Sequence, residues 1–188
     1  MSGHIAWKDV STKTVADYGI FSVTERLSIG PHGREGRFVV LDAPEWAVVV
    51  PVLERGGGRA LVTVRQYRHG LGRACVEFPG GVVERGEDPA TAAARELLEE
   101  TGYRAGRLVA LGSPSPNPAF MANRLHVFVA LDLESAGEQS LDEHEFVDVD
   151  VQPEDRVLAA VGDPPWDHAL MTAAAWYYRR WLEKGRPA

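Results

Sequence analysis

The pattern of hydrophobic and polar residues predicts a chain built mainly from β-strands, with few helices. Residues 18–29 partly alternate apolar and polar side chains, which is typical of a strand with one buried face. Residues 46–53 form a mostly apolar run, which favours a strand buried on both faces. Further strands are predicted at 37–41, 60–64, 74–78, 108–112, 125–131 and 146–151. Helices are predicted at 89–101, at 153–161 and from about 167 to 181.

The connecting segments divide the chain into two parts. Residues 1–42 contain two predicted strands, and two strands alone are only marginally stable, so this extension needs a neighbour. Residues 43–188 form the predicted main domain, in which the glycine-rich segment 54–59 is a hairpin turn. Three prolines within residues 114–118 exclude helix and central strand, and residues 132–145 form an acidic loop. The strands and separate helices together predict a mixed α/β sandwich.

The helix at 89–101 has clear boundary signals. Asp88 is a favourable N-cap, because its carboxylate can accept hydrogen bonds from the first free backbone N–H groups. Pro89 occupies the first helical position, where its missing N–H costs nothing. Gly102 suits the left-handed residue that ends a helix. We therefore expect a helix from Pro89 to Thr101.

Three carboxylates share one face of this helix. Glu96, Glu99 and Glu100 stand at i, i+3 and i+4. Two such charges ~4 Å apart repel by roughly 4 kcal/mol at an effective dielectric of about 20. A hard divalent cation would remove this conflict, and all-oxygen ligands suit Mg²⁺. The alternative is an acidic helix face that is simply solvated.

The stretch from Gly81 to Tyr103 resembles the Nudix box, G-x5-E-x7-R-E-U-x-E-E-x-G-U, in which U is apolar. Every fixed position is matched, by Gly81, Glu87, Arg95, Glu96, Leu97, Glu99, Glu100 and Gly102. Tyr103 at the last apolar position is a mild departure. The resemblance implies a Nudix-type α/β/α sandwich with a mixed sheet, here with a small N-terminal β extension. It also implies hydrolysis of a diphosphate that is linked to another group.

The resemblance also assigns roles within the motif. It implies Mg²⁺, with Mn²⁺ as an alternative ion, held by Glu96, Glu99, Glu100 and the carbonyl of Gly80. Glu87 and Arg95 are implied to form a structural ion pair, which we favour over a direct catalytic role for Arg95. Gly81, Glu87 and Gly102 are then structural residues of the motif.

The general base is predicted outside the helix. Residues 142–146 resemble the Asp-Glu-x-Glu-Phe element of ADP-ribose-type Nudix hydrolases. The resemblance implies that Glu143 is the base and Glu145 an additional metal ligand. An acidic, solvated loop is the alternative.

Substrate-binding candidates lie outside the box. The segment from Arg65 to Arg68 resembles the part of ADP-ribose pyrophosphatases that reaches substrate phosphates, and a guanidinium can bind an oxyanion through two hydrogen bonds. Pro118, sixteen residues after Gly102, resembles the marker of the ADP-ribose subgroup, although its neighbours depart from the usual loop. Glu77 matches a substrate- or metal-facing position. Trp46 either stacks a base or packs in the core. The full set of candidates is Arg68, Arg65, Glu77, Trp46, Arg37 and Pro118. Arg37, or alternatively Arg34, would reach the partner's site in a dimer.

Composition narrows the possible partners and the compartment. The net charge of −7 over 188 residues argues against a general nucleic-acid binder. Cys75 is the only cysteine, so no internal disulfide forms, which fits the reducing cytoplasm. We see neither a signal peptide nor an apolar run of ~18 residues, so we expect no membrane association. By resemblance, the N-terminal extension is expected to form a homodimer.

These observations predict Mg²⁺-dependent hydrolysis of the pyrophosphate bond of ADP-ribose or a related nucleoside diphosphate sugar. The products would be a nucleoside monophosphate and a sugar phosphate. One alternative is a Nudix hydrolase of another nucleotide, such as a dinucleoside polyphosphate or an oxidised nucleotide. Another is a non-catalytic Nudix domain that senses a ligand.

Overall fold

The computed structural model describes residues 3–185 and divides into two compact units. One unit contains the described residues up to Pro44 together with Ser115–Arg124, and the other contains Glu45–Pro114 and the residues from Leu125 onward. We call them the N-terminal unit and the main unit. The chain therefore passes between the units three times.

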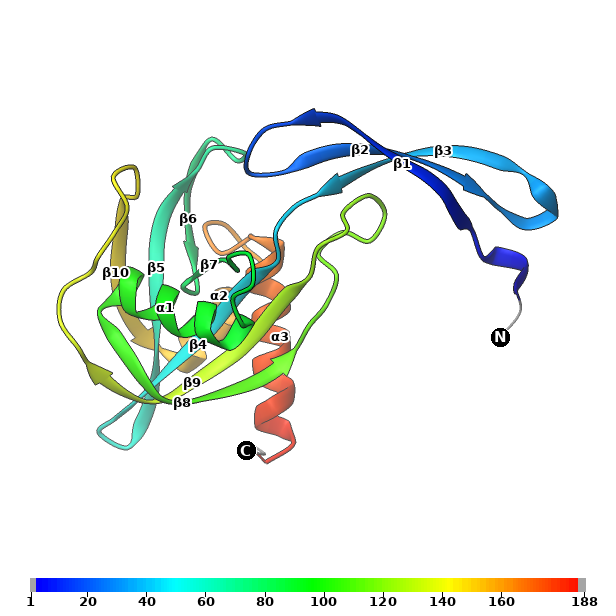
Figure 1. Cartoon of the computed structure of the whole chain (residues 1–188). Coiled ribbons are helices and arrows are strands. Elements are labelled where there is room, and N and C mark those ends of the chain that lie inside the picture. Colours follow the sequence, from blue (N-terminus) through cyan, green and yellow to red (C-terminus); the bar gives the residue numbers. More distant parts are fainter. Residues whose placement is uncertain (1–2, 186–188) are drawn as a thin grey trace. The chain divides into compact units, whose positions relative to one another are not determined.

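The N-terminal unit is an antiparallel sheet with the strand order β1-β2-β3 (Figure 1). Its elements are η1 (Gly3–Ile5), β1 (Lys8–Asp17), β2 (Ser22–Ile29), η2 (Pro31–Gly33) and β3 (Glu35–Asp42). The expectation of two strands was wrong, because β1 was not predicted. Nearly all side chains of β1 are exposed, so the sequence of this strand shows no clear alternation of apolar and polar residues. The loop 115–124 joins this unit through backbone hydrogen bonds of Leu41. The Leu41 N–H donates to the carbonyl of Phe120, and the Ala122 N–H donates to the carbonyl of Leu41.

The main unit is built on a seven-stranded mixed sheet with the order β10-β5-β4-β9-β8, to which β6 adds beside β5 and β7 beside β4. Its strands are β4 (Trp46–Arg55), β5 (Gly58–Arg68), β6 (Arg73–Glu77), β7 (Gly80–Val82), β8 (Tyr103–Gly112), β9 (Leu125–Ser135) and β10 (Val147–Pro153). The β4–β9 pair is parallel and the other pairs are antiparallel. The three residues of β7 were predicted as a turn. The other strands of this unit lie at or near their predicted ranges, and most are longer, although β6 ends at Glu77 and β10 begins at Val147, each one residue inside the predicted bound.

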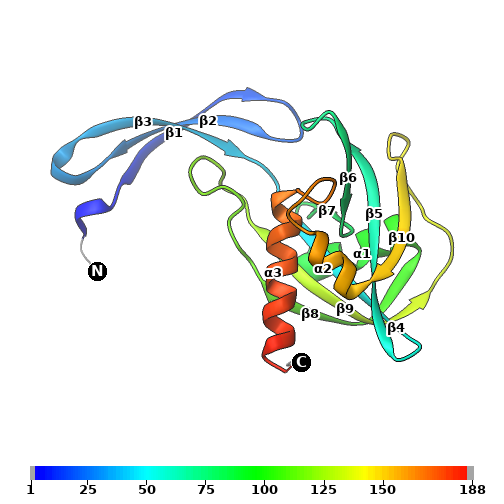
Figure 2. The same cartoon turned by 180° about the vertical axis from the view of Figure 1, so that it is seen from behind.

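Helices cover both faces of this sheet, as Figures 1 and 2 show from opposite sides. Helix α1 (Pro89–Thr101) packs on one face, where Ala47 and Val49 of β4 meet Ala93 and Leu97. Helices α2 (Glu154–Ala160) and α3 (Ala169–Glu183) cover the other face, over alternate residues of the same strand. Because side chains alternate along β4, one strand supplies both cores. The predicted α/β/α sandwich with a mixed sheet is confirmed. None of the helices within residues 3–185 is long and apolar enough to cross a membrane.

Candidate active site

Helix α1 presents the predicted carboxylates and begins and ends where its sequence predicts. The Asp88 side chain accepts hydrogen bonds from the backbone N–H groups of Ala90 and Thr91. Gly102 ends the helix in the left-handed region with φ 70°. The local signals for capping therefore fix where the helix begins and ends, while the burial of Ala93 and Leu97 against β4 sets which face carries the carboxylates.

Arg95 lies at the centre of a group of carboxylates. Its guanidinium donates to both oxygens of Glu87, at 3.1 and 3.2 Å, so the predicted ion pair is present. The same group donates to Glu96 Oε1 at 2.9 Å and Glu99 Oε2 at 3.0 Å. It also donates to the carbonyl of Val82 at 3.0 Å, which ties α1 to β7. The single positive charge of Arg95 is therefore shared among three carboxylates, those of Glu87, Glu96 and Glu99.

The two glycines of β7 allow the carboxylates to approach the backbone. Gly80 N–H donates to Glu100 Oε2 at 2.9 Å. A Cβ on Gly81 would lie 2.4 Å from Glu96 Oε1, and a Cβ on Gly80 would lie 2.3 Å from the Ala47 carbonyl oxygen. A side chain at Gly80 would collide with the backbone of β4, and one at Gly81 would displace the carboxylate of Glu96, so the glycine pair keeps this approach open.

Burial makes the negative charges of the group costly. Glu100 is only 4% exposed, and burial, reinforced by the nearby charges of Glu96 and Glu145, raises its pKa to about 8. Burial also raises the pKa of Glu96. By contrast, hydrogen bonds from Arg95 lower the pKa of Glu87. The acidic face of α1 is therefore a partly buried site with uncompensated charge, and not a solvated surface.

The residues of this group fit a divalent cation. As they stand, no three acidic, histidine or cysteine side chains within residues 3–185 are grouped closely enough to hold an ion. Arg95 forms ion pairs with Glu96 and Glu99, so both carboxylates would have to release it in part to coordinate an ion. The donors are all oxygens, and Glu100 is buried beside like charges, which is the environment that a hard cation stabilises.

The loop between β9 and β10 carries the predicted base. Glu143 is exposed, while Glu145 Oε2 accepts from the Asp142 N–H at 3.3 Å. The negative charge of Glu145 contributes to the raised pKa of both Glu96 and Glu100, so its carboxylate lies close to the acidic face of α1. The roles of Glu143 and Glu145 stay predictions.

A second ionic group lies at the ends of β5 and β6. Glu77 is fully buried, and it accepts from Arg68 Nε at 2.9 Å and Arg68 Nη2 at 2.6 Å. His168, which precedes α3, places Nδ1 3.2 Å from Glu77 Oε1, within ion-pair distance but not aligned as a hydrogen bond. Burial alone would raise the pKa of Glu77, but His168 and Arg68 outweigh it and lower the pKa to about 2. Sequence reasoning missed His168, and no local motif marks it.

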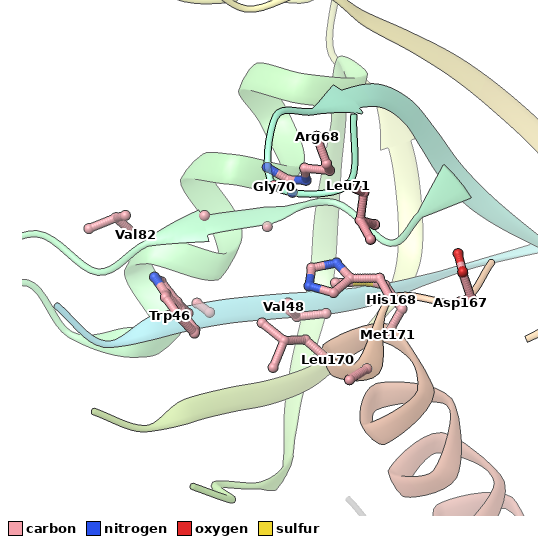
Figure 3. Close-up of a pocket in the computed structure, with 14 residues that line it drawn as sticks. Trp46, Val48, Arg68, Gly70, Leu71, Val82, Asp167, His168, Leu170 and Met171 are labelled. Carbon is pink, nitrogen blue, oxygen red and sulfur yellow. The ribbon is translucent and has the colours of Figure 1, made fainter. Parts of the chain in front are cut away.

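A pocket of about 530 Å³ adjoins this second group (Figure 3). Arg68 and His168 line one part of it, and Trp46 lies across from them. The backbone of Gly80 and Gly81 also lines the pocket. The same glycines therefore contact the acidic group on one side and border the pocket on the other.

The other predicted substrate residues lie outside this pocket. Arg65 is exposed on β5. Arg37 belongs to the N-terminal unit, where it donates to Glu25 at 2.8 Å. Pro118 lies in the 115–124 loop of the same unit. Their contacts with substrate stay predictions.

Comparison with known proteins identifies the family. The model of the NUDIX domain matches residues 43–173. An ADP-ribose pyrophosphatase of Bacillus subtilis (strain 168) is 36% identical over 76% of this chain and 78% of its own. The ADP compounds hydrolase NudE of Escherichia coli (strain K12) is 28% identical over 74% and 72%. A crystal structure of an ADP compounds hydrolase superposes with a TM-score of 0.82, at 26% identity, over 96% of this chain and 97% of that one. The chain therefore belongs to the Nudix family.

Proposed function

We propose that the protein hydrolyses the pyrophosphate bond of ADP-ribose or a related nucleoside diphosphate sugar, with Mg²⁺ as cofactor. The observation that carries the proposal is the group of Glu96, Glu99 and Glu100 on α1, packed against the glycines of β7 in a Nudix chain. The names of the relatives, ADP-ribose pyrophosphatase and ADP compounds hydrolase, support this choice of substrate. The products would be a nucleoside monophosphate and a sugar phosphate.

The acidic group would serve as the seat of the metal. Glu96, Glu99, Glu100, Glu145 and the carbonyl of Gly80 would hold Mg²⁺ or Mn²⁺. When bound, the ion neutralises diphosphate charge and lowers the pKa of a coordinated water. Arg95 would then keep Glu87, which fixes the turn before α1, while its contacts with Glu96 and Glu99 loosen.

Two residues outside the helix would complete the reaction. Arg68 is held side-on by Glu77 through Nε and Nη2, which leaves Nη1 available for a phosphate oxygen. Glu143 would take the proton of the attacking water, because it is an exposed carboxylate on a loop whose Glu145 acts on the acidic group. Positioning and charge stabilisation supply most of the catalysis in phosphoryl transfer, so these roles need little covalent chemistry.

The test is a panel of nucleoside diphosphate sugars, dinucleoside polyphosphates and oxidised nucleotides, each incubated with Mg²⁺ and followed by product identification. We expect AMP and ribose 5-phosphate from ADP-ribose, and no turnover with EDTA. Faster turnover of a dinucleoside polyphosphate or oxidised nucleotide would replace the proposed substrate. Tight binding of ADP-ribose without turnover of any compound would indicate a ligand sensor.

The N-terminal unit would form a homodimer in the cytoplasm. Its small sheet carries exposed apolar side chains, including Val10, Val15, Phe38 and Val39, that a second copy would cover. Light scattering after size-exclusion chromatography should give twice the monomer mass, and Val39→Lys should shift it toward the monomer. A monomeric wild-type protein would contradict the proposal.

A further inference from the structure

We propose that the main unit carries a second hydrolytic site, in which Ser113 is a nucleophile that His126 and Glu45 activate for the cleavage of activated carboxylic esters. The three side chains form one hydrogen-bonded chain. Ser113 Oγ lies 2.9 Å from His126 Nδ1, and His126 Nε2 lies 2.7 Å from Glu45 Oε2. A hydroxyl, an imidazole and a carboxylate in this order generate the nucleophile of serine hydrolases on unrelated folds.

The sheet of the main unit brings the three residues together. Strand β9 runs parallel to β4, with His126 opposite Ala47. Because side chains alternate along a strand, Glu45 lies on the same face of the sheet as Ala47, and His126 lies on the same face as Phe128. Ala47 and Phe128 both belong to the core under α1, so Glu45 and His126 share that face. Ser113 follows the end of β8, which pairs with β9.

The hydrogen bonds fix the direction of proton transfer. An ionised carboxylate can only accept, so in the neutral imidazole of His126 it is Nε2 that carries the proton and donates to Glu45. Nδ1 then holds the lone pair, and the Ser113 hydroxyl donates to it. The basic nitrogen of the ring therefore faces the serine, as a general base requires. Glu45 stabilises the imidazolium that forms when the proton moves.

This group of three side chains is open to solvent and separate from the proposed active site. The side chains of His126 and Glu45 are 19% and 46% exposed, and Ser113 is partly buried. Ala47 pairs with Gly81 on one edge of β4 and with His126 on the other. Two strand spacings, about 10 Å, therefore separate the backbone of Gly81 from that of His126. An ester can reach Ser113 without entering the acidic group.

The reaction balances with water as the only co-reactant. Ser113 Oγ attacks the carbonyl carbon and passes its proton to His126 Nδ1. The tetrahedral adduct then expels the alcohol, which takes that proton as the bond from carbon to its oxygen breaks. Water attacks the acyl-serine in the same way and releases the acid. Aryl esters are the expected substrates, because their leaving group departs easily and a partly exposed site stabilises charge less than a buried one.

Covalent labelling tests the nucleophile in the wild-type chain. An activated serine displaces fluoride from a fluorophosphonate and keeps the phosphonyl group on Oγ. Incubation of the full chain with this probe in EDTA should add one label, which peptide mass spectrometry should locate at Ser113. Protein unfolded in urea should stay unlabelled, since the arrangement depends on the fold. No label, or a label at another residue, would overturn the inference.

Hydrolysis of 4-nitrophenyl acetate, also in EDTA, supplies the second measurement. Ser113→Ala and His126→Gln should each lower the rate by about 10²-fold, the typical contribution of a general base, and Glu45→Gln should lower it by about 10-fold. The matched control is Ser115→Ala, which removes an exposed serine two positions away. Equal rates in folded Ser113→Ala and Ser115→Ala would contradict the proposed nucleophile.

The outcome is independent of the proposed function. Mg²⁺-dependent hydrolysis of ADP-ribose should stay near the wild-type rate in Ser113→Ala, whereas Glu99→Gln should lose that activity and keep the esterase rate. Loss of both activities in folded Ser113→Ala would show that this serine supports the structure of the metal site, and would overturn the inference. If the wild-type chain hydrolyses no nucleotide, the proposed function fails, and the label at Ser113 still decides on the esterase.

Discussion

Two arginine–carboxylate groups border the same pair of glycines, and they are built in opposite ways. Around Arg95, one guanidinium binds Glu87, Glu96 and Glu99. Among residues 3–185, the Glu100 side chain nearby accepts a hydrogen bond from a backbone N–H alone. Around Glu77, one fully buried carboxylate receives Arg68 through two hydrogen bonds and has His168 beside it. The first group carries excess negative charge, and the second is compensated.

The difference in charge balance indicates different roles. The group around Arg95 has the environment of a cation site, whereas the group around Glu77 holds side chains in place. Burial, reinforced by the nearby negative charges, raises the pKa of Glu100, whereas His168 and Arg68 outweigh burial and lower the pKa of Glu77. A carboxylate with a raised pKa is stabilised by an added cation, while one with a lowered pKa already has its partners. Substitution of the metal-binding candidates in the first group should therefore mainly affect activity, and substitution of the buried Glu77 in the second group should mainly affect stability.

The largest effect is expected for Glu99→Gln. The neutral amide would weaken the proposed metal seat, so kcat should fall on the order of 10³-fold, because metal ions contribute several kcal/mol to charge stabilisation. Its ion pair with Arg95 is partly exposed, so the free energy of unfolding should change by less than about 1 kcal/mol. Steady-state assays and thermal unfolding measure both quantities.

The control for this experiment is Glu84→Gln, an exposed carboxylate in the turn before α1. It removes the same charge nearby and should keep wild-type activity. Unfolding of Glu99→Gln would show that Glu99 stabilises the fold, against the proposed contrast between the two groups. A fall in the kcat of Glu84→Gln as large as that of Glu99→Gln would show that loss of any nearby charge lowers activity, and would contradict the contrast as well.

Glu143→Gln tests whether the loop before β10 supplies the general base for the proposed metal site on α1. Loss of a general base should lower kcat by about 10²-fold and leave Mg²⁺ affinity unchanged. Exposed Glu143 should not affect stability. A kcat within a few-fold of wild type would remove it as the base, and Glu145→Gln would be the next variant to assay.

The sequence predicted the first group as a unit, but of the second it predicted only Arg68 and Glu77, as separate candidates, and missed His168, for a physical reason. Helix α1 is specified by neighbours in sequence, since Asp88, Pro89 and Gly102 set its ends and the i, i+3, i+4 spacing sets its acidic face. The second group depends on the tertiary fold, because His168 lies 91 positions after Glu77 and carries no motif. Strand β1 was missed for a related reason, since exposure on both faces removes the alternating pattern.

Glu77→Gln should destabilise the protein more than any other single change in these two groups. Removing one partner of a buried ion pair typically costs about 3 kcal/mol, because the remaining charge stays desolvated. For a domain of this size the Tm should fall by roughly 6–12 °C. Thermal unfolding measures this, with Glu84→Gln as the matched control. A fall of less than about 2 °C would show that the pair is not important for stability.

The smallest expected effect is a dependence of stability on acid pH that Glu77 alone contributes. Its pKa is lowered from 4.5 to about 2 in the folded state, so its stabilising contribution is present above pH 4.5 and is lost as the pH falls toward 2. Between pH 4.5 and 3.5 this group should account for about 1 kcal/mol, or roughly 2–4 °C in Tm. Other carboxylates titrate in the same range, so the measured quantity is the difference in Tm between wild type and Glu77→Gln at each pH. That difference should narrow as the pH falls, because protonation of Glu77 removes the charge that the variant already lacks. A difference that stays constant from pH 6 to pH 3 would mean that Glu77 stabilises the fold by packing and not by its charge.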